Sequence, residues 1–382
     1  MDRSAPLGVY VHWPYCARIC PYCDFNVVRD RGRTQEQADL ADAIVADLVA
    51  QRGLTGERRL LSIFFGGGTP SLMDPVQVAR VIETAKRLWS PVADLEISLE
   101  ANPTDAEAGR FAALADAGVQ RLSLGVQALD DESLKALGRN HDAGGARRAI
   151  AAATQAFPRL SIDLIYARPG QTDAAWRAEL AEAIALGPEH VSPYQLTIEH
   201  GTAFDRAVGR GTLVVPDEDL AAALFETTQD LLEGAGFDAY EVSNHARGVA
   251  ARSRHNLVYW RGVDYVGVGP GAHGRLALPE GRAATVAHRA IKDYVAAVRD
   301  TGVGFEREVL TPEEAAEERL VLGLRIDDGV AFSEMAPLGL APDTPKVRDL
   351  VETGLLADDR NRLRATRAGR LVLDRLTGAL AT

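Results

Sequence analysis

Three cysteines stand close together near the start of the chain, as Cys16, Cys20 and Cys23, and the chain has no others. Their spacing is C-x3-C-x2-C. Three thiolates on one short loop can bind a single soft metal centre and leave its fourth position open. An iron-sulfur cluster with one exposed iron suits this set, because the exposed iron can then bind a further molecule. The motif therefore predicts a cluster that binds a second ligand.

Structural thiols, a disulfide and a zinc site are the alternatives to the cluster. Unrelated buried thiols would be scattered over the 382 residues rather than gathered in one short segment. A disulfide would leave one cysteine of the three without a partner. Structural zinc normally takes four N or S ligands from two C-x2-C pairs, and here it would need His12 or Asp24 as the missing ligand. The spacing favours the cluster.

The composition is that of an ordinary globular protein, and it argues against several classes. Cysteines without partners indicate a reducing compartment. We find neither an apolar signal core at the N-terminus nor an apolar run near the ~20 residues that span a bilayer, so we expect a cytoplasmic protein. A net charge of -12 opposes wide contact with a phosphate backbone, and we expect no nucleic-acid partner.

Apolar strands alternate with amphipathic helices over the first half of the chain. Helical spacing of apolar residues predicts helices at 34–50, 74–88, 104–116, 132–137, 143–156 and 173–186. Near-continuous apolar runs, typical of parallel strands buried on both faces, predict strands at 9–12, 60–65, 95–100, 121–127, 160–166 and 190–196. Six strands alternating with helices predict parallel βαβ units and an α/β fold.

Polar residues and glycines fall at or just beyond the carboxyl ends of these strands. They are Cys16, 66–69, Glu100, Gln127 and Asp163. In parallel β/α barrels that end of the sheet carries the chemistry. A carboxylate inside a buried strand needs a compensating partner. Each residue alone is equally well explained by a helix cap or an internal hydrogen bond, but together they predict one site at a barrel rim.

The second half of the chain is less regular. A helix is expected at 217–234 and a strand at 237–242. The segment 264–274 is expected to be a strand that enters a glycine-rich loop, whose glycines permit either close approach to a ligand or a tight turn. From 306 onward, helices at 311–324 and 344–352 and short strands at 354–356 and 362–366 give a winged-helix-like outline.

A chain of this length can hold a barrel-sized domain plus an appendage. We therefore predict a core domain at 1–305, with a partial barrel at about 1–205 followed by an extension that carries residues 255–260. The remainder, 306–382, is predicted to be a small C-terminal helical domain.

The opening motif, Tyr10-x-His12-x-Pro14-Tyr15-Cys16-x3-Cys20-x2-Cys23, resembles that of radical S-adenosylmethionine (SAM) enzymes of the oxygen-independent coproporphyrinogen oxidase-like family. The resemblance continues through the segments 66–70, 122–127 and 163–166. Within that family the chain is most similar to the haem chaperone branch. Phe25 stands where the oxidase branch has a further cysteine, and residues 255–260 read H-N-L-V-Y-W, which matches the H-N-x-x-Y-W segment of the chaperone branch.

The resemblance implies a partial (β/α)6, TIM-like radical SAM barrel. It also implies that Cys16, Cys20 and Cys23 ligate a 4Fe-4S cluster and that the methionine part of SAM chelates the open iron. The residues that would contact SAM are Tyr10, Tyr22, Gly67, Gly68, Thr69, Glu100, Gln127, Arg139 and Asp163, with Gln195, Ala272 and His273 as weaker candidates for the adenine end.

Some positions depart from the family pattern. They are Trp13, Tyr15, Ala167, Arg168 and Gly274, and Arg168 in particular would alter what enters the barrel mouth.

His255 is the candidate haem ligand that the family pattern implies. The alternative is a hydrogen-bonded structural histidine, which is what most lone histidines are, and His245 is the nearest competitor as a ligand. Neighbouring residues suit haem, because aromatic rings can stack on the macrocycle and guanidinium groups can pair with propionates. These neighbours are Arg252, Arg254, Tyr259 and Trp260.

The leading hypothesis is a haem chaperone that holds a 4Fe-4S cluster and SAM and transfers haem to an acceptor protein, with membrane-associated acceptors among the candidates. The alternative is an oxygen-independent coproporphyrinogen III oxidase-type decarboxylase of porphyrin biosynthesis, in which SAM supplies the radical chemistry. A third and weaker hypothesis is a DNA-linked regulator that acts through the C-terminal domain.

Overall fold

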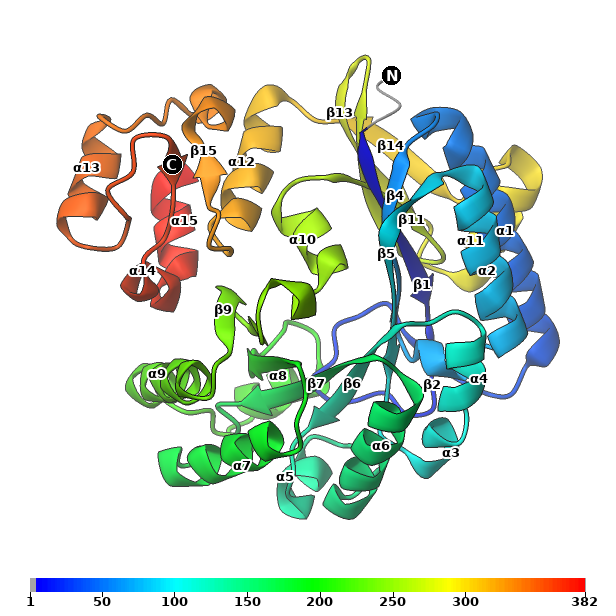
Figure 1. The fold of residues 1–382 in the computed structure, drawn as a ribbon, viewed down its shortest axis with the longest axis horizontal. Coiled ribbons are helices and arrows are strands. Elements are labelled where there is room, and N and C mark those ends of the chain that lie inside the picture. Colours follow the sequence, from blue (N-terminus) through cyan, green and yellow to red (C-terminus); the bar gives the residue numbers. More distant parts are fainter. Residues whose placement is uncertain (1–4, 382) are drawn as a thin grey trace.

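The computed structural model describes residues 5–381, and one wide sheet forms its frame (Figure 1). Within these residues twelve strands lie in the order β14-β13-β12-β11-β1-β4-β5-β6-β7-β8-β10-β9. Six neighbouring strands in the middle are mutually parallel, which confirms the α/β prediction. They are β1 (Pro6–Trp13), β4 (Arg59–Gly67), β5 (Ser90–Ala101), β6 (Arg121–Gln127), β7 (Arg159–Tyr166) and β8 (His190–Gln195).

Helices connect these parallel strands and cover the outer side of the sheet (Figure 1). Capping side chains and apolar faces determine where these helices begin and how they pack. In α2, for example, the Asp74 side chain accepts a hydrogen bond from the Val76 N–H, and Val78, Val81 and Ile82 are buried on one face. The connecting helices are α1 (Thr34–Thr55), α2 (Pro75–Leu88), α3 (Asp105–Ala108), α4 (Phe111–Asp116), α5 (Asp131–Ala136), α6 (Ala143–Ala156) and α7 (Asp173–Ala185).

The sheet is wider than the six predicted strands. On one side, β11 (Asp264–Val268) runs parallel to β1 and is followed by the antiparallel strands β12 (His273–Leu278), β13 (Gly281–Ala287) and β14 (Phe305–Val309). On the other, β10 (Asn244–Ala246) and β9 (Asp238–Glu241) extend it from β8. The helices of this half are α8 (Ala203–Gly209), α9 (Glu218–Gly234), α10 (Arg254–Trp260) and α11 (Ile291–Thr301).

The end of the chain forms a C-terminal unit, residues 310–381, with an apolar core of its own around Leu320, Met335 and Leu376. Its helices are α12 (Pro312–Gly323), α13 (Pro345–Glu352), α14 (Arg367–Leu371) and α15 (Leu373–Ala381), and the last two were not predicted. The segments predicted as short strands, 354–356 and 362–366, lie antiparallel to each other, with a bridge from Leu356 to Ala365 and a hydrogen bond from the Thr366 N–H to the Leu355 carbonyl at 3.0 Å. The start of the second segment, β16 (Arg362–Leu363), also pairs with β15 (Val330–Ala331), which was not predicted.

The predicted domain limit at 305/306 stays a prediction. Strand β14 crosses it, because its residues pair with β13 of the main sheet as far as Val309. In the described part of the chain, no helix has the length and apolar character needed to cross a membrane.

The glycine-rich segment formed by the end of β11 and the loop after it packs against the protein itself. A Cβ atom on Gly267 would lie 2.0 Å from the backbone oxygen of His273, and one on Gly269, whose φ is +99°, would lie 2.2 Å from the backbone oxygen of His12. The glycines therefore let the loop approach β1 and β12 closely, as a tight turn requires, rather than opening it to a ligand.

We expect Gly267→Ala to lower the free energy of unfolding by about 1–3 kcal/mol, because the added methyl group overlaps a backbone carbonyl that cannot move freely. Gly53→Ala in α1 is the matched control, since a Cβ atom there meets nothing within 4 Å and alanine favours the helix. Urea unfolding of both variants measures the difference. Equal stability of the two variants would contradict this account of the loop.

Candidate cofactor site

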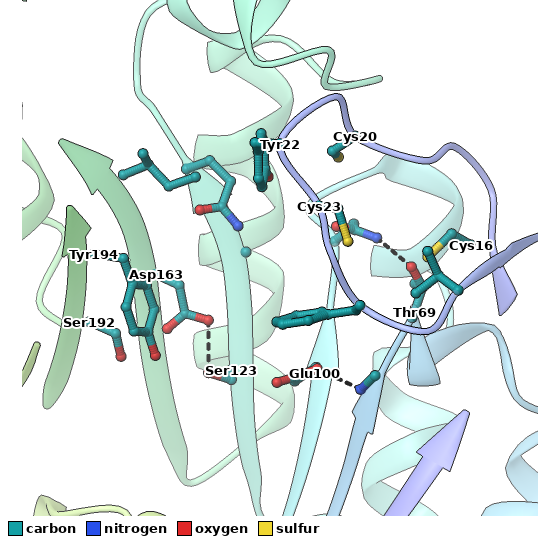
Figure 2. A pocket seen from close by; sticks show the side chains of 18 of the residues that line it. Cys16, Cys20, Tyr22, Cys23, Thr69, Glu100, Ser123, Asp163, Ser192 and Tyr194 are labelled. Carbon is teal, nitrogen blue, oxygen red and sulfur yellow. Dashed lines mark hydrogen bonds between the residues drawn. The ribbon is translucent and has the colours of Figure 1, made fainter. Parts of the chain in front are cut away.

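A cavity of about 420 Å³ lies at the carboxyl ends of the parallel strands, and all three cysteines line it. Figure 2 shows the cysteine loop on one side of the cavity and the polar residues of β5 to β8 facing it. The structure therefore brings the residues predicted at the strand ends together at one rim of the barrel.

Hydrogen bonds hold the cysteine loop at its start, its middle and its end. Strand β2 (Tyr15–Cys16) pairs with β3 (Val28–Arg29), and the Thr69 N–H donates to the Tyr15 carbonyl at 2.8 Å. Within the loop, the Cys23 N–H donates to the Cys20 carbonyl at 3.2 Å. The Arg139 guanidinium donates from Nη1 to Cys20 Sγ at 3.3 Å and so supplies a positive charge beside the sulfurs.

The three cysteine thiols suit a cofactor that binds each of them at a different metal atom. Burial raises the pKa of Cys16 to about 11 and also raises the pKa of Cys23, so a bound metal is needed to hold these sulfurs as thiolates at neutral pH. Among the side chains that the structure describes, no three of His, Cys, Asp or Glu are gathered closely enough to hold one metal ion. A 4Fe-4S cluster does not require this, because its cysteines bind different irons.

The two candidates for a fourth zinc ligand are placed poorly for it. His12 has hydrogen-bond partners at both ring nitrogens, with the Tyr10 hydroxyl 3.0 Å from Nδ1 and the Asn26 carbonyl 2.9 Å from Nε2. Asp24 is exposed and does not line the cavity. The geometry thus favours the cluster over structural zinc.

Two carboxyl groups, Glu100 and Asp163, face the cavity opposite the cysteines (Figure 2). The Gly67 N–H donates to Glu100 Oε2 at 3.2 Å, and the Ser123 hydroxyl donates to Asp163 Oδ2 at 2.9 Å. Burial, with the nearby Asp163 carboxylate adding to it, raises the pKa of Glu100 to about 8, and burial also raises the pKa of Asp163. A cationic ligand group such as an ammonium would relieve this cost.

Gln127 is held in a strained backbone conformation, with φ at 69°. The pairing of β6 with β7 shifts register between Gly125 and Gln127, which places this residue at the cavity. Its Oε1 atom is buried and has no hydrogen-bond partner. Such an atom suits a ligand hydroxyl, as on a ribose.

The structure brings most of the predicted SAM residues together and leaves three out, Tyr10, Ala272 and His273. Tyr10 does not line the cavity, because its ring stacks on Phe64 and its hydroxyl contacts His12. Gln195 lines the cavity, whereas Ala272 and His273 do not. The predicted residues that do line it are Cys16, Cys20, Tyr22, Cys23, Gly67, Gly68, Thr69, Glu100, Gln127, Arg139 and Asp163.

Several lining residues were not predicted from the sequence, among them three polar residues on β6 and β8, and one residue expected at the entrance lies elsewhere. Ser123 stands two residues before Gly125 on β6, and Ser192 stands two residues before Tyr194 on β8, and all four line the cavity. This alternation along a strand is the signal that could have revealed them. Arg168 does not line the cavity, because its guanidinium donates to Glu179 Oε1 at 3.1 Å outside it.

His255 is fully buried in α10 and lies beside the cavity rather than in its wall. Its Nδ1 is 2.8 Å from the Ser62 hydroxyl and its Nε2 is 2.6 Å from the Tyr259 hydroxyl. Burial lowers its pKa to about 3, so the imidazole is neutral at physiological pH. The competitor, His245, is also buried and contacts Gln229.

Comparison with known proteins identifies the family. Residues 10–183 match the Radical SAM superfamily, and residues 310–372 match the HemN C-terminal domain. The chain is 33% identical to heme chaperone HemW of Bacillus subtilis, over 97% of this chain and 98% of that protein. It is 35% identical to heme chaperone HemW of Mycobacterium tuberculosis, over 98% and 95%. The chain belongs to the HemW group of the radical SAM family.

The chain also has relatives in organisms other than bacteria. Radical S-adenosyl methionine domain-containing protein 1, mitochondrial, of Bos taurus is 41% identical over 98% of this chain and 87% of that protein. Among solved structures, coproporphyrinogen III oxidase (HemN) from Escherichia coli superimposes with a TM-score of 0.80 at 22% identity, over all of this chain and 91% of that chain. That likeness confirms the radical SAM fold.

Membership of the radical SAM family implies a 4Fe-4S cluster and SAM as cofactors. The residues around the cavity are compatible with both, since thiols lie on one wall and unsatisfied polar groups on the other. The residue-by-residue contacts with these cofactors remain predictions.

The raised pKa of Glu100 makes stability depend on pH. A carboxyl group whose pKa is about 8 when folded and 4.5 when unfolded binds its proton more tightly in the folded state, so ionisation opposes folding. In the cofactor-free protein, the free energy of unfolding should therefore fall between about pH 4.5 and pH 8, by up to about 1.4 kcal/mol for each pKa unit.

Glu100→Gln removes this penalty, so the variant should gain stability relative to the parent chain as the pH rises from 5 to 8. Urea unfolding at several pH values measures this, with Glu132→Gln on exposed α5 surface as the control. A stability difference that does not change with pH would refute the raised pKa.

Proposed function

We propose that the chain is a haem chaperone, which binds haem and transfers it to an acceptor protein while holding a 4Fe-4S cluster and SAM. The observation that supports it most is the similarity, from end to end, to proteins named heme chaperone HemW. The match covers both the barrel and the C-terminal unit, so the chain shares the whole arrangement and not the cofactor domain alone.

The cavity residues have separate tasks in this proposal. Cys16, Cys20 and Cys23 hold the cluster, and Arg139 offsets the negative charge of their sulfurs. Glu100 and Asp163 hold the ammonium and ribose groups of SAM. When bound, the cluster and SAM together supply one-electron chemistry.

His255 is the proposed haem ligand, and its present hydrogen bonds would have to change for the iron to bind. A haem iron needs the neutral imidazole with one free nitrogen, and Nε2 is occupied by the Tyr259 hydroxyl. Arg252 and Arg254, the candidates for the propionates, pair with Asp327 and Asp94. Haem binding at this place therefore requires α10 to open.

A decarboxylase remains the second candidate, because the cavity keeps the three cluster cysteines and the facing carboxyl groups, although Phe25 stands where the oxidase branch has a further cysteine. Cleavage of SAM would not decide between the two, since both proposals keep the cofactors. The fate of the porphyrin does decide: a chaperone binds haem and leaves coproporphyrinogen III intact, whereas a decarboxylase releases carbon dioxide from it.

The remaining parts of the proposal concern the cellular compartment and the acceptor protein. The unpaired cysteines support a reducing compartment such as the cytoplasm, although three vertebrate relatives carry the word mitochondrial in their names. The acceptor is proposed to be a haem protein, either soluble or bound to a membrane.

Haem titration of anaerobically prepared protein tests the proposal. We expect a shifted Soret band with the parent chain, and at least about tenfold weaker binding with His255→Ala, because the iron loses its axial ligand. His200→Ala is the matched control, since that side chain is fully exposed at the surface and should bind haem as the parent does.

Absence of haem binding by the parent chain would overturn the chaperone proposal. Unchanged binding by His255→Ala would overturn the ligand assignment. Release of carbon dioxide from coproporphyrinogen III by protein carrying its cluster, reductant and SAM would establish the decarboxylase instead.

A further inference from the structure

Glu241, the last residue of β9, is a buried carboxylate whose two oxygens both have partners. Its Oε1 accepts from Arg325 Nε at 2.7 Å, and Arg325 follows α12 in the C-terminal unit. Its Oε2 accepts from the Ser243 N–H at 2.8 Å and from Asn244 Nδ2 at 2.6 Å. The carboxylate thus joins the C-terminal unit to the edge of the main sheet.

From Asn244 the hydrogen bonds continue to the cofactor cavity. Asn244 Oδ1 accepts from the Ser192 hydroxyl at 3.2 Å and from Asn256 Nδ2 at 3.5 Å. Ser192 and Asn256 both line the cavity. Asn256 is also the residue after His255 in α10, so this path reaches the helix that carries the proposed haem ligand.

The same Arg325 holds the other end of α10. Its guanidinium carbon lies 4.8 Å from the centroid of the Trp260 ring, and Trp260 is the last residue of the helix. Arg319, in α12, donates from Nη1 to the Trp260 carbonyl at 3.0 Å. A helix of seven residues has little stability alone, so these contacts decide whether it stays in place.

The backbone around Arg325 is docked as well. The Val242 N–H donates to the Arg325 carbonyl at 3.2 Å, and the Asp327 N–H donates to the Tyr240 carbonyl at 3.3 Å. Residues 325–327 therefore lie along β9 like a short added strand. Figure 1 shows α10 between the C-terminal unit and the strands β4, β5 and β11, and it contacts both sides.

We propose that Arg325 is a positioning residue through which the C-terminal unit holds α10 in place with its His255 buried, so that haem reaches this histidine when the ion pair with Glu241 opens. The inference rests on the proposed function for its haem step. Its structural step, the control of α10 by the C-terminal unit, rests on the contacts above alone.

Physical reasoning gives the direction of the effect. Replacing the Arg325 guanidinium removes both its hydrogen bond to buried Glu241 and its contact with the Trp260 ring, so α10 loses contacts that hold it in place. When a ligand binds only the open form of a protein, a larger population of that form speeds binding. The apparent affinity rises by the same factor as the population of the open form. Weakening the Arg325 contacts should therefore make haem bind faster at His255.

Three full-length variants test this. The double variant Glu241→Gln with Arg325→Met replaces the ion pair by neutral groups of similar size and leaves no buried charge unpaired. Arg325→Lys keeps the charge but loses the planar contact with Trp260. Arg367→Ala is the matched control, because Arg367 links the C-terminal unit to Glu226 and Asp230 of α9 and not to α10.

Two measurements are made on each variant: hydrogen-deuterium exchange of the amides of 254–260, and the rate of haem association followed at the Soret band. In the double variant we expect α10 exchange and haem association to be faster by at least about tenfold, with exchange of β1 and β4 unchanged. Arg325→Lys should fall between the double variant and the parent, and Arg367→Ala should match the parent.

Unchanged exchange of α10 in the folded double variant would overturn the inference, and so would faster exchange spread evenly over the whole chain. Faster α10 exchange without faster haem association would overturn the haem step. If the parent chain binds no haem, the proposed function fails while α10 exchange still decides whether Arg325 positions the helix.

Discussion

The structure depends on one electrostatic constraint: the carboxyl ends of the parallel strands bring ionisable groups into a cavity where the protein alone leaves them poorly compensated. Glu100 and Asp163 have raised pKa values there, Gln127 keeps an unpaired oxygen, and Cys16 is held as a thiol by burial. Such groups are costly in a folded protein. A cofactor with soft metal, ammonium and hydroxyl groups offsets each of these costs, and for that reason the cavity is best understood as a binding site.

The elements around the cavity serve this constraint. The pairing of β2 with β3 fixes where the cysteine loop starts and ends, and the register shift in β6 turns Gln127 inward. Gly67, with φ at +105°, directs its N–H to Glu100, and any side chain at this position would collide with His12. Local backbone features therefore place polar groups where the chemistry needs them.

The sequence was sufficient for what depends on local pattern. The six parallel strands, their helices and the rim of polar residues follow from apolar periodicity and from the rule that strand ends carry the site. The sequence was insufficient where contacts between residues far apart in the chain decide the position of a side chain. Tyr10 turns away because Phe64 and His12 take its ring and hydroxyl, and β10, with three residues, is too short to leave a pattern. Arg168 is withdrawn from the cavity by Glu179 on the next helix, and the two bonds that occupy His255 come from Ser62 and Tyr259.

The central claim is that three cysteines hold a 4Fe-4S cluster with one iron left for SAM. Mössbauer spectroscopy of the anaerobically reconstituted chain, recorded with and without SAM, tests it most directly. The account predicts the signature of a cubane cluster, in which one iron site of the four changes when SAM is added. A spectrum without a cubane, or one in which no iron site responds to SAM, would contradict it.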